Sequence, residues 1–212
     1  MLFIDDYSRM TRVKFLKEKF EAFVKFKAFK ALVENETTLK IKCIRSDIGG
    51  EFTSNEFEVL CENHGIKRHF SAARTPQQNG LVERKNINVH KMARTMLKKV
   101  KIPDTFWREV VDTSVYILNR GQIRVNNSKT PSELWKGRPA SVKYFKVFGS
   151  KCYIKRSEDN FGKLDSRVDE GIFLGYVYGS KAYKYYNKRL HKIVESIDVR
   201  VDEEISQKYE HT

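Results

Sequence analysis

Cysteine and proline are scarce in this sequence, and long apolar runs are absent. The 212 residues include three cysteines and four prolines. Cys43, Cys61 and Cys152 lie far apart and form no CxxC pair, which argues against a zinc knuckle and a disulfide framework and favours a reducing compartment. No apolar run reaches about 18 residues, and no basic N-terminal stretch precedes an apolar one. We therefore expect neither a membrane span nor a secretory signal.

Several short catalytic motifs are missing as well. The sequence contains no HExxH, no GxxxxGK(S/T) and no evident Ser-His-Asp arrangement, and its histidines are scattered. These gaps argue against a zinc peptidase, a P-loop nucleotide site and a serine hydrolase. Nothing in the sequence indicates a small-molecule substrate.

Acidic residues are outnumbered by basic ones. The chain has 41 Lys and Arg against 27 Asp and Glu, for a formal net charge of +14. Such a surplus indicates a polyanionic partner, most often nucleic acid. The simpler interpretation is a basic protein whose charges only keep it soluble. An apolar fraction of 40%, with 12% aromatic residues, is enough to form a folded core.

The first two thirds of the chain alternate between strand and helix patterns. We expect a strand in residues 1–4, a polar turn at 5–8, and a second strand that reaches Leu16. A helix with a phenylalanine stripe for core packing follows at 19–36, then a strand at 39–46, a helix at 55–65 and a strand at 66–71. A loop is expected at 72–80, and long helices at 81–100 and 104–120. This order predicts an α/β fold, with a mixed sheet flanked by helices.

The pattern changes near residue 140. From about 145 to 202, short apolar runs are separated by Gly, Asn and charged turns, and the helical period disappears. This spacing is typical of a small all-β barrel. We predict one domain at 1–140, a small barrel at 141–205 and a frayed tail at 206–212.

Two acids stand out by their spacing and surroundings. Asp47 follows a predicted strand and Glu83 starts a predicted helix, and 35 residues separate them. Glu83, Asn86 and His90 fall at i, i+3 and i+7 and share one helix face. Residues 84–101 then hold seven Lys or Arg and no acid.

This arrangement has two interpretations. Paired carboxylates beside a cationic helix are typical of a Mg²⁺ site for phosphodiester chemistry, with Lys and Arg holding the DNA backbone. Alternatively, Glu83 only complements the dipole at the N-terminus of its helix, and the basic face is merely solvated. The spacing alone leaves both open.

Four stretches resemble one protein family: "IRSDIGGEFTSNEF", "ARTPQQNGLVERKNINVHKMARTML", "FWREVVDTSVYILNR" and "KTPSELWKGRPASVKYFKVFGS". Together they are similar to the integrase of copia-type long-terminal-repeat retrotransposons, and the similarity covers essentially the whole chain. The resemblance implies a ribonuclease-H-like core followed by a Src-homology-type barrel. Asp47 and Glu83 match the second and third acids of the family's D,D(35)E triad, which implies that both are catalytic and hold Mg²⁺ or Mn²⁺.

The resemblance also implies a reaction and its partners. An integrase trims the 3′ ends of element DNA and then joins a 3′-hydroxyl to target DNA, so element ends and target DNA are the expected partners. A homo-oligomer is a further possibility. The nucleus is the expected location, with cytoplasmic virus-like particles as the other option. The residues expected to contact DNA are Lys85, Asn86, His90, Lys91 and Arg94.

The sequence departs from the family pattern at two places. The family's first catalytic Asp lies on a strand upstream of the segment that "LFIDDYSR" resembles, so we expect a core truncated at its N-terminus that lacks this strand and acid. Asp5 and Asp6 match a turn where the family carries acids without catalytic duty. Ile48 stands where the family usually has Asn, and isoleucine cannot form side-chain hydrogen bonds.

These departures leave the function divided between two hypotheses. The first is a truncated copia-type integrase with weakened metal binding, little or no strand transfer alone, and marginal stability or a tendency to associate because unpaired strand edges remain. The second is a transposon remnant that binds nucleic acid or another partner without chemistry. A decayed fragment with no retained role is a third, weaker option.

Overall fold

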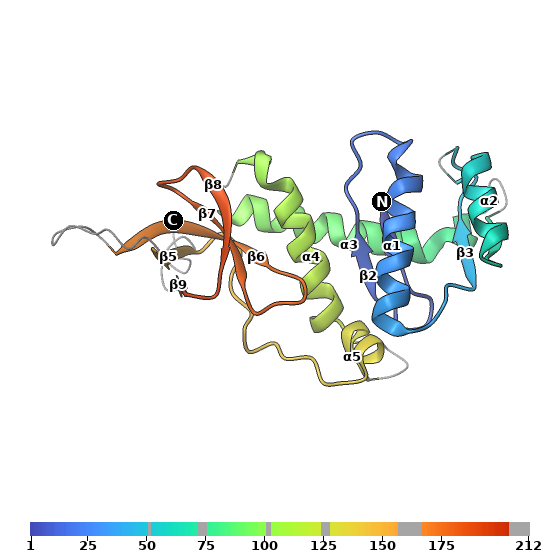
Figure 1. Ribbon diagram of the computed structural model, residues 1–212. Coiled ribbons are helices and arrows are strands. Elements are labelled where there is room, and N and C mark those ends of the chain that lie inside the picture. The colour runs from blue at the N-terminus through green and yellow to red at the C-terminus, as the bar shows by residue number, and fades with distance from the viewer. Residues whose placement is uncertain (51, 72–75, 101–102, 124–127, 157–166, 204–212) are drawn as a thin grey trace. The chain divides into compact units, whose positions relative to one another are not determined.

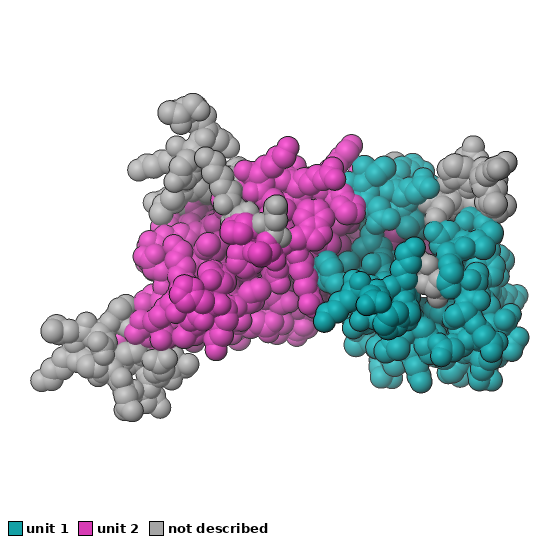
Figure 2. Space-filling view, turned by 90° about the horizontal axis from the view of Figure 1, so that it is seen from above, with its two compact units in different colours: residues 1–3, 12–87 teal, residues 4–11, 88–212 magenta. Residues whose placement is uncertain are grey.

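The computed structural model describes residues 1–50, 52–71, 76–100, 103–123, 128–156 and 167–203. The chain divides into two compact units, shown in different colours in Figure 2. Unit 1 comprises residues 1–3 and 12–87, and unit 2 comprises residues 4–11 and 88–212. Within the described ranges, no helix is both long and apolar enough to cross a membrane.

Unit 1 combines short strands with helices (Figure 1). The first two strands pair with each other and the next two form a separate parallel pair, in which Cys43 stands opposite Lys67 and Ser46 opposite Phe70. The elements, some of which extend into unit 2, are β1 (Leu2–Ile4), β2 (Thr11–Val13), α1 (Glu21–Thr37), β3 (Cys43–Ser46), α2 (Asn55–Asn63), β4 (Lys67–Phe70) and α3 (Pro76–Val100).

A cluster of phenylalanines forms the interior of unit 1. Phe26 of α1 and Phe57 of α2 are almost fully buried, and their ring centroids are 4.8 Å apart. Phe3 stacks on Phe29 at 4.0 Å and extends the cluster to β1. Most of the phenylalanine stripe of α1 therefore packs inward as expected, but Phe20, just before the helix, is 75% exposed.

Unit 2 holds the rest of α3 and a sheet of five antiparallel strands in the order β8-β7-β6-β5-β9 (Figure 1). Its further elements are η1 (Asp104–Phe106), α4 (Trp107–Gly121), α5 (Pro131–Lys136), β5 (Lys151–Lys155), β6 (Val168–Tyr176), β7 (Tyr183–Asn187), β8 (Lys192–Ser196) and β9 (Val199–Asp202).

Helix α4 packs on β6 at a point where only glycine fits. The Thr113 hydroxyl donates a hydrogen bond to the Leu174 carbonyl at 2.9 Å. Gly175 has φ +136°, and a Cβ at this residue would lie 2.0 Å from Thr113 Oγ1. The pairing of β6 with β7 shifts register between Phe173 and Gly175, as a β-bulge does. Any side chain at residue 175 would therefore separate the helix from the sheet and strain the backbone.

A buried carboxylate ties three segments of the sheet together. Asp169 of β6 is 4% exposed; its carboxylate accepts hydrogen bonds from Arg189 at 2.8 Å, Asn187 at 2.8 Å and Arg156 at 2.6 Å. The bonds from Arg189 first, and then from Asn187 and Arg156, hold the pKa of Asp169 well below its usual range, against the opposing effect of burial.

Asn119 of α4 fixes the segment at residues 4–11 within unit 2. Its side-chain oxygen accepts a hydrogen bond from the Thr11 amide at 3.0 Å, and its side-chain nitrogen donates to the Thr11 carbonyl at 2.7 Å. Both residues are fully buried, so these bonds replace the water that the Thr11 backbone would otherwise bind.

The order of strands and helices through α4 agrees with the prediction, but the predicted mixed sheet is two separate two-stranded pairs, and β3 begins at Cys43 rather than at residue 39. Other elements differ as well. Strand β2 ends at Val13, so Leu16 lies outside it. Helix α3 begins at Pro76 rather than Leu81, and the first part of the predicted loop is therefore helical. Helix α5 had no counterpart in the prediction.

The predicted domain boundary near residue 140 stays a prediction. The division between the two units falls between residues 87 and 88, inside α3, and it describes compactness rather than evolutionary domains. The predicted frayed tail, 206–212, lies outside the described residues.

Candidate active site and nucleic-acid interface

Asp47 lies directly after the carboxyl end of β3 in unit 1, as the sequence predicted. Its side chain is exposed, and its backbone carbonyl accepts a hydrogen bond from Ser46 Oγ at 3.0 Å. Ligand-binding side chains often occupy the carboxyl ends of parallel strands. The Asp47 side chain is therefore accessible to solutes, and the end of β3 fixes its position in the backbone.

Arg68 of β4 holds the loop that follows Asp47. The loop closes through the Phe52 amide and the Gly49 carbonyl at 2.9 Å. The Arg68 guanidinium donates a hydrogen bond to the Phe52 carbonyl and pairs with Glu58 at 3.6 Å. Sequence reasoning missed this role, because a cation in a short strand carries no signal of its long-range partner.

Glu83 is exposed and is the eighth residue of α3. Because α3 begins at Pro76, its first turn contains no acid. The interpretation of Glu83 as a partner of the helix dipole at the N-terminus is therefore wrong, since that effect falls off beyond the first turn. Glu83 and Asp47 both belong to unit 1, and across the described residues neither side chain forms a hydrogen bond or an ion pair.

The two carboxylates have the donor chemistry of a hard-cation site. Mg²⁺ and Mn²⁺ prefer carboxylate oxygens and complete their shells with water and substrate phosphates. In the part of the chain that the structure describes, no group of three or more His, Cys, Asp or Glu is placed to hold a metal ion. Asp47 and Glu83 each fit such an ion in donor type and exposure, and that they hold one together stays a prediction.

Asp5 and Asp6 take part in the turn between β1 and β2. The Asp5 carboxylate accepts hydrogen bonds from the Ser8 amide at 2.7 Å and the Ser8 hydroxyl at 2.6 Å. Asp6 pairs with Arg9, whose φ is 63°. Both acids therefore stabilise a turn, and they belong to unit 2, whereas Asp47 belongs to unit 1.

The residues expected to contact DNA are divided between the two units. Lys85 and Asn86 belong to unit 1, and His90, Lys91 and Arg94 to unit 2. All are exposed except Lys85, which is half-buried and already interacts with another residue of the chain. The His90 ring lies 5.7 Å from the Trp107 ring, so that its orientation is restricted by packing. Their role in DNA binding stays a prediction.

The comparisons with known proteins identify relatives along nearly the whole chain. The family described as "Retroviral polymerase SH3-like domain" matches residues 150–212. The retrovirus-related Pol polyprotein from transposon TNT 1-94 of Nicotiana tabacum is 39% identical over 93% of this chain, and that from transposon RE2 of Arabidopsis thaliana is 32% identical over 96%. The chain spans 15% and 14% of the lengths of these polyproteins.

A solved structure supports the fold. The simian T-cell lymphotropic virus intasome in complex with PP2A regulatory subunit B56 gamma contains a chain that aligns with a TM-score of 0.55 and 16% identity, over 94% of this chain and 70% of that one. The predicted fold class, an α/β integrase-type core followed by a small Src-homology-type barrel, is thereby confirmed, and the absence of the first strand of the core stays a prediction. The chain is therefore related, along nearly its whole length, to one segment of the retrovirus-related Pol polyproteins of plant transposons.

Proposed function

We propose that the chain is the integrase segment of a copia-type retrotransposon Pol polyprotein and acts on DNA as a polynucleotidyl transferase. Its reaction would be trimming of element 3′ ends, followed by transfer of a 3′-hydroxyl to target DNA. The observation that carries the proposal is the pair Asp47 and Glu83: two exposed carboxylates in unit 1, separated by 35 residues, in a relative of Pol polyproteins. Its working location would be the nucleus.

Asp47 and Glu83 would hold Mg²⁺ or Mn²⁺. When bound, such an ion activates a hydroxyl and stabilises charge on the phosphodiester in the transition state. The chain's own contribution is to position the two carboxylates and the substrate. Arg68 holds the loop after Asp47 through the Phe52 carbonyl, and Arg84 bonds the Gly80 carbonyl one helical turn before it at 3.1 Å.

The basic residues of α3 would bind the DNA backbone. Lys91, Arg94 and Lys98 are exposed, and cations of this kind neutralise phosphates and make binding fall steeply with salt. Asn86 and His90 would add hydrogen-bonding groups at the same helix. A second copy of the chain would serve as a further partner if the working form is an oligomer.

A second candidate function is nucleic-acid binding without chemistry. The specific observation in its favour is that the described residues bring together no group of three metal-binding side chains. Weak metal binding is therefore compatible with both candidates. They differ in whether Mn²⁺ binding depends on Asp47 and Glu83.

The experiment titrates the 212-residue chain with Mn²⁺ and follows free Mn²⁺ by electron paramagnetic resonance. Asp47→Asn and Glu83→Gln should each weaken binding by about tenfold or more, because they remove a direct ligand and even outer-shell losses reach that size. Glu62→Gln is the matched control, since Glu62 is an exposed carboxylate of the same unit. Cleavage and joining of labelled duplex oligonucleotides in Mn²⁺ are measured in parallel.

The outcomes are distinct. Mn²⁺ binding that depends on Asp47 and Glu83 but not on Glu62 supports the proposal, and strand joining abolished by Glu83→Gln would establish it. Salt-sensitive DNA binding, with the Mn²⁺ affinity unchanged in Asp47→Asn and Glu83→Gln, would contradict the proposal and favour nucleic-acid binding without chemistry.

A further inference from the structure

A pocket of about 310 Å³ opens in unit 2, and neither Asp47, Glu83 nor any residue of α3 is among the residues that line it. It is formed by the end of α4, by α5 and the chain that follows it, and by the turn between β6 and β7. Four tyrosines and four cations contribute to its lining, and none of the described residues that line it is acidic. Its size is at the lower end of the range for small-ligand pockets.

A preformed stack of aromatic rings and a guanidinium forms one wall. The Tyr116 ring lies parallel to the Tyr176 ring, with 4.2 Å between centroids and 8° between planes. The Arg120 guanidinium lies 3.5 Å from the Tyr116 centroid. A parallel ring and a guanidinium at these distances cannot share one face, so Tyr116 lies between Tyr176 and Arg120.

The base of this stack is held rigidly. Tyr176 is buried, and its hydroxyl accepts a hydrogen bond from the Lys146 amide at 2.8 Å. Burial raises the pKa of Tyr176 to about 12. Arg120 in turn donates to the Tyr116 carbonyl at 3.3 Å. The outer face of the Arg120 guanidinium is therefore presented in a fixed orientation, and guanidinium planes are surfaces on which nucleobases stack.

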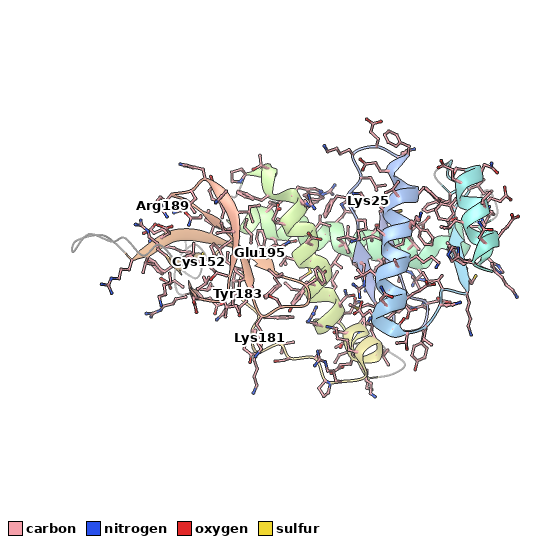
Figure 3. All side chains as sticks on the ribbon, in the orientation of Figure 1. Lys25, Cys152, Lys181, Tyr183, Arg189 and Glu195 are labelled. Atoms are coloured by element: carbon pink, nitrogen blue, oxygen red, sulfur yellow. The ribbon has the colours of Figure 1, made fainter. Side chains whose placement is uncertain are left out.

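The lining also includes one exposed aromatic ring and exposed cations. Tyr144 is 61% exposed, and its carbonyl accepts a hydrogen bond from the Tyr183 hydroxyl at 3.2 Å. Arg138 and Lys181 are exposed, and neither forms an ion pair with any residue that the structure describes. Lys181 belongs to the turn between β6 and β7, and Tyr183 begins β7; both are labelled in Figure 3.

Two carboxylates that the structure describes in unit 2, Glu133 and Glu203, are already engaged. Glu133 closes the capping box at the start of α5 and also accepts from the Ala140 amide at 3.1 Å. Glu203 pairs with Lys146 at 3.4 Å and accepts from the Val147 amide at 3.1 Å. Among the residues that the structure describes, Arg138 and Lys181 therefore have no anionic partner and remain available to an external anion.

We propose that this pocket binds one unpaired nucleotide of single-stranded nucleic acid. The base stacks against Tyr144 and the Arg120 guanidinium, and Arg138 and Lys181 bind the flanking phosphates. Aromatic side chains interleaved with cations are the usual surface for single strands, because every base has a stacking face. A methylated-amine ligand does not fit, because the lining carries positive charge and no carboxylate.

A purely structural explanation covers only part of the pocket. Arg120 lies in the last turn of α4, where a cation stabilises the helix, and its contact with Tyr116 adds cation–π stability. This accounts for Arg120 but not for the exposed Tyr144 ring or for the two unpaired cations, Arg138 and Lys181. The site involves neither Asp47 nor Glu83, so it stands or falls independently of the catalytic proposal.

The test measures binding of the full chain to short fluorescein-labelled oligothymidylate and oligouridylate by fluorescence anisotropy. Tyr144→Ala should weaken binding by about 5- to 150-fold, the loss expected for one base–aromatic stack, whereas Tyr144→Phe should keep it. Lys181→Ala should reduce the slope of log Kd against log salt by about 0.7. Lys192→Ala, an exposed lysine of β8 outside the pocket, is the charge control.

A second readout locates the contact. Photo-crosslinking with a single strand that carries 5-iodouracil should attach to the peptide that contains Tyr144. Binding of DNA, RNA or both with these losses supports the proposal. Equal affinity of Tyr144→Ala, Lys181→Ala and Lys192→Ala for the single strand would overturn it. A duplex of the same sequence that binds more tightly than the single strand, and loses that affinity in Tyr144→Ala, would overturn it too. Displacement of the oligonucleotide by oligoglutamate at equal charge would also overturn it, because charge alone would then explain binding.

Discussion

The interiors of the two units are built from different side chains. Unit 1 packs phenylalanine rings from β1, α1 and α2 around Phe57, with Leu60, Cys61 and Ile66 beside them. Unit 2 also has an apolar interior, with Phe173 and Leu174 fully buried, but it adds buried polar groups: the Asp169 carboxylate, the Asn119 amide, and the Tyr185 ring with its hydroxyl. Apolar packing depends on volume, whereas buried polar groups depend on the direction of each hydrogen bond.

This difference determines which kind of substitution most lowers the free energy of unfolding of each unit. An apolar cluster loses stability gradually as volume is removed, but a buried charge becomes costly once its partners are gone. The sequence also supplies separate probes, because both tryptophans, Trp107 and Trp135, belong to unit 2. Tryptophan fluorescence therefore reports on unit 2, and the reactivity of Cys61 reports on unit 1.

The largest effect is expected from Asp169→Ala. This change leaves Arg156 and Arg189 without their shared carboxylate. The loss of one partner from a buried ion pair costs about 3–5 kcal/mol of unfolding free energy, and the loss here should fall below that range, because the Arg189 side chain is 39% exposed and can be hydrated. Urea unfolding followed by tryptophan fluorescence measures it. If the units unfold separately, the protection of the Cys61 thiol against a thiol reagent should fall much less than the stability of unit 2.

Glu195→Ala is the matched control for Asp169→Ala. Glu195 lies on β8 of the same sheet and pairs with Lys184 at 4.0 Å, with its side chain 51% exposed. An exposed pair of this kind contributes little, so the midpoint should hardly move. Equal losses for the two variants would contradict the distinction between buried and surface charge in unit 2.

Acid should weaken unit 2 through the same carboxylate. The pKa of Asp169 is lowered in the folded chain, chiefly by Arg189 and then by Asn187 and Arg156, so its stabilisation is complete above the ordinary carboxyl pKa of about 3.9. It declines as pH falls below that value, because the unfolded chain then binds the proton more tightly. Unfolding monitored by tryptophan between neutral and strongly acidic pH should show the decline, and Asp169→Asn should lack that part of it.

Unit 1 should respond to acid in the same direction but less strongly. A hydrogen bond from Lys30 is the main cause of the lowered pKa of Glu34, and this carboxylate pairs with that single cation at 2.7 Å. Glu34→Gln isolates its share. The comparison would be reversed if acid lowered the protection of the Cys61 thiol against reaction more than it lowered the stability reported by tryptophan fluorescence.

The smallest effect concerns the rates at which thiols react. Cys43 is exposed, whereas Cys61 and Cys152 are buried, and burial raises the pKa of both, that of Cys152 to about 12. A thiol reagent should therefore modify Cys43 rapidly in the native protein, and the other two only on opening. Single-cysteine variants compare their rates, and Cys61 should react before Cys152, because a five-stranded sheet encloses the latter.

Much of the fold was predictable because its elements carry a local period. Helix α1 follows its phenylalanine stripe, and α2 begins where Ser54 accepts a hydrogen bond from the Phe57 amide at 3.3 Å. The start of α3 was missed because "TPQQNG" has the composition of a loop. Proline is nevertheless favourable in the first helical turn, and the helix continues through Asn79 and Gly80.

The sequence of α5 contains a helix-capping pattern that could have predicted the helix. Thr130 and Glu133 form a reciprocal capping box, Pro131 occupies the first turn, and Gly137 ends the helix in the left-handed region. This pattern predicts a helix start and stop, but six residues leave no room for periodicity.

The candidate site was predictable only where its chemistry is local in sequence. The two acids and the basic run of α3 were visible as residue types and spacing. The role of Arg68 and the pocket in unit 2 depend on contacts between distant segments: the pocket joins Arg120, Tyr144 and Lys181 from three separate stretches. Tyrosines and lysines near residues 181–188 indicated only strands, because a single sequence does not reveal which segments converge.

The contact between α4 and β6 has a consequence for how sequences of this kind diverge. Thr113 Oγ1 occupies the space that a Cβ at residue 175 would need, and the two positions are distant in the chain. Mutational drift at one position is therefore constrained by the other, so an alignment of relatives should show glycine at 175 wherever 113 carries a hydroxyl. A relative that lacks the glycine should carry a smaller residue at 113 and a straighter β6. Positions 113 and 175 should therefore vary together at the junction of helix and sheet.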